Sequence, residues 1–195
     1  MDRLLLKDLV AWRCKNYRLP LILNGARQVG KTYLLEQFGA SYYTNTIRIN
    51  LESDTLAREL FEGDLHPNRL IAYLESHTGQ QIQPEKTLLI LDEIQASERA
   101  LTSLKSFAED APQYHIAAAG SLLGVAVNRE KYSFPVGKVD ELNLYPLDFE
   151  EYLSAMNKQQ LIGLIRQHFA DNEKMPNAAT KTRQNWIFSC NKENK

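Results

Sequence analysis

Eight consecutive residues carry the main fold signal of this chain: Gly25-Ala26-Arg27-Gln28-Val29-Gly30-Lys31-Thr32. They fit the pattern G-x-x-x-x-G-K-[ST], in which a glycine-rich loop binds phosphate groups. Residues 19–24 before the loop predict a short apolar strand, and residues 33–38 after it predict the opening of a helix. This context directs several backbone N–H groups and the positive end of the helix dipole at one point. We therefore predict that these eight residues bind a polyphosphate.

A second signal lies where the apolar run 87–91 ends in two acids, Asp92 and Glu93. A continuous apolar run without a polar face is typical of a strand buried on both faces of a parallel sheet. Ligands of such sheets bind at the carboxyl ends of the strands. Because Mg²⁺ prefers oxygen ligands and keeps several waters, we predict that the Thr32 hydroxyl and Asp92 hold this ion. Lys31 is predicted to contact the β- and γ-phosphates.

Glu93 distinguishes hydrolysis from transfer to a small acceptor. A second carboxylate beside the metal ligand can polarise a water for attack on the γ-phosphate, so we predict Glu93 as the catalytic base. Lys31 is predicted to act together with Glu93 by neutralising charge on the phosphate oxygens. Two interpretations of Ser121 stay open: a catalytic hydrogen bond to the γ-phosphate or the water, and a strand cap. Arg129 is a candidate for the transferring phosphate, here or in a neighbouring subunit, against the simpler interpretation of a solvated surface arginine.

Composition and charge exclude several classes of protein. The 195 residues are 44% hydrophobic and carry a net charge of −1, so no global basic field favours a nucleic-acid partner. The two cysteines, Cys14 and Cys190, fit no metal or redox spacing and are expected to be reduced, which favours a cytoplasmic location. No apolar run approaches the roughly 20 residues that span a bilayer, so no membrane partner is expected.

Strand and helix patterns alternate along the chain. Apolar or alternating runs predict five strands, at 19–24, 46–51, 87–91, 114–121 and 138–144. Helical spacing predicts the helices, at 1–17, from 33, and at 55–61, 68–77, 97–110, 149–156 and 159–169. Residues 122–134 are expected to form an irregular loop. The alternation predicts an α/β fold whose sheet is mainly parallel.

Four segments together resemble a family of bacterial and archaeal AAA-type ATPases. They are GARQVGKT at 25–32, LLILDEIQ at 88–95, AAAGSLL at 117–123 and FPVGKVDELNLYPLDFEEYL at 134–153. The resemblance covers most of the chain, from about residue 3 to 169. It implies a P-loop NTPase domain of the AAA type, a three-layer αβα sandwich with a five-stranded sheet and helices on both faces.

The resemblance also carries expectations for the site. It implies that ATP and Mg²⁺ bind here, with Lys31, Thr32, Asp92 and Glu93 in the roles argued above. Ser121 matches the sensor position that follows the fourth strand of the family.

The C-terminal region departs from the family pattern. Similar proteins continue, by resemblance, into a second domain, whereas here the helical pattern stops before Met175-Pro176. Residues 172–195 are rich in Asn and Lys and predict a disordered or irregular tail after an AAA-type domain at 1–171. Our hypothesis is that the chain is a C-terminally truncated member of the family.

The leading interpretation is an ATPase domain coupled to an unknown protein or nucleic-acid client, with a homo-oligomer as an open possibility. A GTPase would need D-x-x-G after the metal strand, but Ile94-Gln95-Ala96 follows Asp92-Glu93. A small-molecule kinase would need an acceptor pocket and an arginine-rich lid, and the sequence shows no clear one. A nucleotide-dependent switch or a degenerate remnant that binds ATP without turnover is the remaining alternative.

Overall fold

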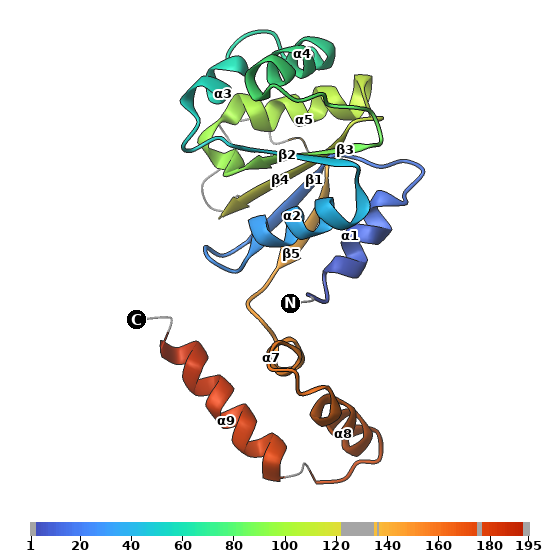
Figure 1. Ribbon diagram of the computed structural model, residues 1–195, viewed down its shortest axis with the longest axis vertical. Helices are drawn as coiled ribbons and strands as arrows, with labels where there is room; N and C mark the ends of the chain where they lie inside the picture. The colour runs from blue at the N-terminus through green and yellow to red at the C-terminus, as the bar shows by residue number, and fades with distance from the viewer. Residues whose placement is uncertain (1–2, 122–134, 136, 175–176, 193–195) are drawn as a thin grey trace. The chain divides into compact units, whose positions relative to one another are not determined.

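The computed structural model describes residues 3–121, 135, 137–174 and 177–192 (Figure 1). The expected loop at 122–134, with Arg129, lies outside these residues. The chain divides into two compact units, which are treated separately below. The larger is Leu5–Tyr145, and the smaller combines Met1–Leu4 with Pro146–Lys195. The sequence placed the end of the AAA-type domain at 171, and that boundary stays a prediction.

The larger unit contains a five-stranded parallel sheet. Its strands are β1 Leu21–Gly25, β2 Asn45–Asn50, β3 Thr87–Asp92, β4 His115–Ser121 and β5 Asp140–Leu144. Their order across the sheet is β2-β3-β4-β1-β5, and every neighbouring pair is parallel. Each predicted strand is therefore confirmed to within about two residues. The parallel sheet and the alternation of elements confirm the predicted α/β fold.

Helices of this unit cover both faces of the sheet (Figure 1). They are α1 Leu6–Arg13, α2 Lys31–Tyr42, α3 Thr55–Leu60, α4 Pro67–Thr78 and α5 Glu98–Asp110, with a short 3₁₀ turn, η1, at Ile94–Ala96. Successive residues of a strand face opposite sides of a sheet. Leu89 and Leu91 accordingly pack with residues of α4 and α5, whereas Leu88 and Ile90 pack with residues of α1 and α2. The result is the expected three-layer αβα sandwich.

Helix α1 is shorter than the helix predicted at 1–17. It begins at Leu6 and ends at Arg13, where the backbone N–H groups of Cys14 and Lys15 donate to the carbonyls of Val10 and Trp12 at 3.2 Å each. The indole N–H of Trp12 donates to the carbonyl of Leu19 at 2.9 Å. This bond ties the end of α1 to the segment that leads into β1, so the helix ends one residue after Trp12, the last apolar residue of its pattern.

The smaller unit contains three helices among its described residues: α7 Phe149–Ala155, α8 Gln159–Ala170 and α9 Asn177–Lys192. Helix α7 begins with a capping box, in which Asp148 and Glu151 bond each other's backbone N–H groups. The buried Glu151 carboxylate also accepts from Arg3 Nε at 3.0 Å and from the Leu4 N–H at 2.8 Å. These bonds join the N-terminal residues to the smaller unit.

Helix α9 corrects the expectation of a disordered or irregular tail at 172–195. The tail lacks a continuous apolar stripe, which is why its sequence gave no helical signal. In the structure Ala179 is buried, and the Trp186 ring packs on Phe149 with centroids 5.6 Å apart. Tertiary packing of a few side chains stabilises this helix, and such contacts are invisible to local periodicity.

Candidate nucleotide-binding site

The phosphate loop and the two acids meet at the carboxyl edge of the sheet. Strand β1 ends at Gly25, which lies opposite Ser121 at the end of β4. Strand β3 ends at Asp92, which lies opposite Ala119 of the same neighbour. Parallel pairing therefore brings three strand ends together. The side chains of Thr32 and Asp92 are in contact at this edge, although they are 60 residues apart in the sequence. The sheet produces the convergence that the sequence could only predict.

Two glycines of the loop meet different steric demands. Gly30, at the start of α2, has φ of 92°, a left-handed conformation that residues with a Cβ rarely adopt. Gly25 leaves no room for a side chain, because a Cβ there would lie 2.4 Å from the carbonyl oxygen of Leu144 in β5. The loop is thus packed directly against the neighbouring strand. Gln28 also has positive φ, at 65°.

Lys31 is buried and bonds its own loop. Its ammonium donates to the carbonyl of Gly25 at 3.0 Å and to that of Ala26 at 2.7 Å. Burial lowers the pKa of Lys31, while the nearby charges of Glu93 and Asp92 oppose that shift. An ammonium has three donors, so nucleotide contact requires exchange of these loop bonds or use of the third.

Thr32 and Asp92, the two predicted metal ligands, lie in contact with each other. The Thr32 hydroxyl lies 3.1 Å from each carboxylate oxygen of Asp92, and the Glu93 N–H donates to Oδ1 at 3.2 Å. Burial raises the pKa of Asp92, and the hydrogen bond from Thr32 opposes that shift. Arg48 offers partial compensation from 3.8 Å. A buried, under-compensated carboxylate beside a hydroxyl oxygen fits Mg²⁺, which takes oxygen ligands and brings two positive charges.

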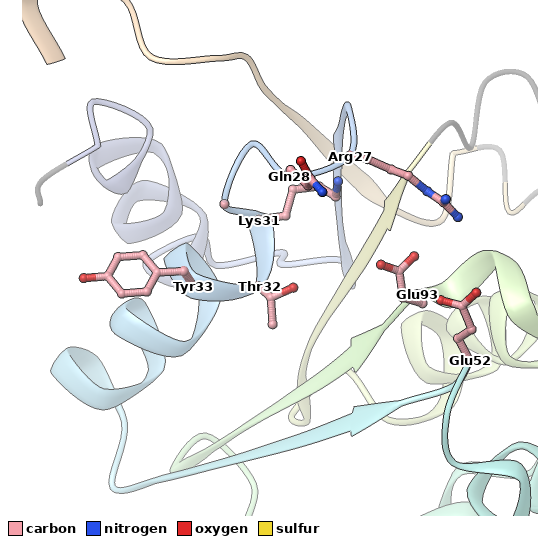
Figure 2. Close-up of a pocket in the computed structure, with 8 residues that line it drawn as sticks. Arg27, Gln28, Lys31, Thr32, Tyr33, Glu52 and Glu93 are labelled. Carbon is pink, nitrogen blue, oxygen red and sulfur yellow. The ribbon is translucent and has the colours of Figure 1, made fainter. Parts of the chain in front are cut away.

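A cavity of about 460 Å³ lies in front of the loop (Figure 2). It is lined by Arg27, Gln28, Gly30, Lys31, Thr32, Tyr33, Glu52 and Glu93. Figure 2 shows Glu93 across from Lys31 and Thr32, with its carboxylate turned toward them. The cavity thus combines the predicted phosphate-binding residues with the predicted base.

The remaining predicted residues lie around this cavity rather than on its wall. Gly25 and Ala26 accept the Lys31 bonds, and Val29 packs against the core beside α2. Asp92 is buried behind Thr32, and Ser121 is buried at the end of β4. Both interpretations of Ser121 therefore stay open.

Tyr33 and Glu52 line the cavity but were not singled out from the sequence. Tyr33 directly follows Thr32 and was assigned only to the helix. Glu52 comes two residues after the end of β2, in a turn where the Asn50 side chain accepts from the N–H groups of Glu52 and Ser53 at 3.0 Å each. The rule that parallel strands end at the same edge is the signal that identifies Glu52.

A parallel sheet with a G-x-x-x-x-G-K-T loop after β1 and an acid ending β3 defines a P-loop NTPase domain. Residues 17–153 match a family described as AAA domain, and the chain belongs to that family. Membership of this family supports nucleotide binding. A comparison with curated proteins returned no match.

Solved structures also share similarity with the chain. C. elegans PCH-2 is 16% identical, with 89% of this chain and 48% of that chain covered and a TM-score of 0.45. AMPPCP-bound DnaA from Aquifex aeolicus is 15% identical, and the match covers 89% of this chain and 52% of that chain, with a TM-score of 0.43. The chain spans about half the length of these two proteins. Within the part of the chain that the structure describes, no helix is both long and apolar enough to cross a membrane.

Proposed function

We propose that this AAA domain binds ATP with Mg²⁺ and hydrolyses it, in a cycle coupled to a protein or nucleic-acid client. The observation that carries the proposal is the 3.1 Å contact between Thr32 and Asp92, beside a cavity lined by both Lys31 and Glu93. Phosphate donors, oxygen ligands for a cation and a carboxylate base are the groups that phosphoryl transfer to water requires. ATP rather than GTP is proposed because Ile94-Gln95-Ala96 follows the acids in place of the D-x-x-G motif of a GTPase.

Each residue has a separate part in the proposed reaction. The loop backbone binds the β-phosphate, and Lys31 neutralises charge on the β- and γ-oxygens. Thr32 and Asp92 hold Mg²⁺, which supplies positive charge to the phosphates when bound. Water attacks the γ-phosphorus while its bond to the bridging oxygen breaks, and ADP leaves with the electron pair. Glu93 accepts the proton that the water loses.

Two variants of the full chain test this proposal. Lys31→Ala should abolish binding of a fluorescent ATP analogue. Glu93→Gln should retain that binding and lose phosphate release, because an amide cannot take the proton. Glu62→Gln changes an exposed acid outside the cavity in the same way and should behave as wild type. Hydrolysis that survives in Glu93→Gln would refute the assigned base, and tight binding by Lys31→Ala would refute the phosphate site.

A nucleotide-dependent switch without turnover is the second candidate. One observation favours it: the Lys31 ammonium is already engaged by the carbonyls of Gly25 and Ala26. Tight ATP binding by wild type with no phosphate release, at every protein concentration tested, would support the switch and contradict the hydrolase.

The wider setting is also a proposal. We place the domain in the cytoplasm, without a membrane partner, as an ATPase whose client and oligomeric state are to be identified. Sedimentation of the full chain with and without ATP and Mg²⁺ tests for a homo-oligomer, and a mass equal to one chain under all conditions contradicts it.

A further inference from the structure

The Gln95 side chain bonds the carboxylate of Glu93. Gln95 lies in η1, the 3₁₀ turn that directly follows Glu93, and its amide Nε2 donates to Glu93 Oε2. Among the described residues, no other side chain or backbone group donates a hydrogen bond to this carboxylate. The predicted base is therefore held through one of its two oxygens.

The local backbone sets up this contact. Glu93 has φ of 52° and ψ of 48°, the left-handed conformation, which is strained for a residue with a Cβ. The following turn is anchored by Ile94, which is fully buried. Backbone bonds close the turn, from Ala96 to Glu93 at 2.9 Å and from Ser97 to Ile94 at 3.2 Å. This sharp, anchored turn brings the side chains of Glu93 and Gln95 together.

Chemistry determines which end of the Gln95 amide faces Glu93. An ionised carboxylate only accepts hydrogen bonds, so the NH₂ group must face it and the amide oxygen must face away. That oxygen, Oε1, is buried, and no group in the described part of the chain donates to it. A buried acceptor without a donor destabilises the folded state. The orientation of the Gln95 amide therefore contributes little to stability. This favours a role for Gln95 in the site.

We propose that Gln95 is a positioning residue that holds the Glu93 carboxylate for its reaction with water. By bonding Oε2, Gln95 removes rotational freedom from a long side chain and leaves Oε1 to face the cavity. A free glutamate side chain would otherwise lose rotamer entropy when it is ordered for the reaction. The inference rests on the proposed hydrolysis, since it names the residue that orients the base of that reaction.

Turnover measurements test the role against simple packing. Gln95→Met keeps the length of the side chain but cannot donate, and Gln95→Glu also repels Glu93. Both should lower kcat about tenfold to a hundredfold, the effect of a misplaced catalytic group, with KM within about twofold of wild type. Gln37→Met is the matched control, because Gln37 also has a buried Oε1 without a donor but lies outside the cavity. It should leave kcat unchanged.

A double-mutant comparison decides whether Gln95 acts through Glu93. Adding Gln95→Met to Glu93→Gln should cause less than about a twofold further loss of kcat, because residues that act as a unit are non-additive. An equal loss in both backgrounds would overturn the proposal, as would a change in KM alone.

An NMR measurement checks the contact without any turnover. The side-chain NH₂ signal of Gln95, assigned by its loss in Gln95→Met, should be shifted downfield from those of exposed glutamines. Glu93→Ala should return it to the ordinary position, and a signal that does not respond to Glu93→Ala overturns the contact. A shifted signal in a protein that binds but never hydrolyses ATP supports the contact and refutes only the proposed hydrolysis.

Discussion

The unfolding free energy of the Leu5–Tyr145 unit should fall by about 3 kcal/mol between pH 7 and pH 4 through one side chain, His115. This histidine begins β4 and is only 4% exposed. Its Nδ1 lies 2.7 Å from the Tyr43 hydroxyl, and the Trp12 ring packs against it at 6.2 Å between centroids. Burial, followed by the positive charges of Arg18 and Arg13, lowers the pKa of His115 from 6.5 to about 4.

The sign and size follow from linkage. Between pH 6.5 and pH 4 the unfolded chain binds a proton at His115 that the folded protein excludes, so acid favours unfolding. The contribution of neutral His115 to the unfolding free energy is fully present above pH 6.5 and is lost as the pH falls toward 4. At about 1.4 kcal/mol per pH unit, a depression of roughly two and a half units corresponds to about 3 kcal/mol.

Urea unfolding of wild type and His115→Asn, followed by circular dichroism at several pH values, measures this loss. The asparagine oxygen can accept a hydrogen bond from Tyr43, but the asparagine side chain does not titrate. Subtracting the two curves of unfolding free energy against pH therefore cancels the contribution of the carboxylates that both proteins share. The wild-type advantage should shrink by about 3 kcal/mol from pH 7 to pH 4. A difference that stays constant with pH would refute the buried, neutral imidazole.

Four further predictions concern the site and two glycine positions. Lys31→Ala should lose the rise in Tm that ATP gives wild type, roughly 5–10 °C at one hundred times Kd, and an equal rise by scanning fluorimetry would contradict the phosphate loop. Asp92→Asn should bind ATP without responding to Mg²⁺ in calorimetry; a wild-type Mg²⁺ response would exclude Asp92 as a ligand. Gly39→Ala should destabilise by about 1–3 kcal/mol in urea, because its Cβ would lie 2.3 Å from Thr46 Oγ1. Gly163→Ala meets no atom within 4 Å and should instead stabilise α8 by up to about 1 kcal/mol; a loss at Gly163 equal to that at Gly39 would contradict the packing argument.

The strands and the core of the site could be predicted because their signals are local. The apolar run at 87–91 is a strand whether or not its neighbours are known, and β3 is indeed buried along its whole length. The loop residues from Gly25 to Thr32 form a short consecutive pattern whose chemistry does not depend on distant contacts. Asp92 was predicted from its place at a strand end, and the structure puts its carboxylate 3.1 Å from the Thr32 hydroxyl.

Other features depended on contacts between distant segments. Glu52 carries no motif, and only the parallel pairing of β2 with β3 brings its turn to the cavity. Helix α9 has no apolar stripe, and its packing through Ala179 and Trp186 could not be read from spacing. The bond from Gln95 to Glu93 lies within one short segment, yet it depends on a left-handed residue that propensity does not predict.

By itself, the sequence determined the motifs of the family: a glycine loop predicted to bind phosphate, and two acids at a strand end predicted to hold a metal ion and to activate a water. These properties belong to residue types and short spacings, so they survive without coordinates. Only the tertiary structure decided which groups meet. Register across the parallel sheet sets Gly25 beside Ser121 and Asp92 beside Ala119, and the turn after β3 sets Gln95 against Glu93. The loop from Gly25 to Thr32 predicts the class of ligand, and the packing of the strands around it determines which side chains lie beside the loop.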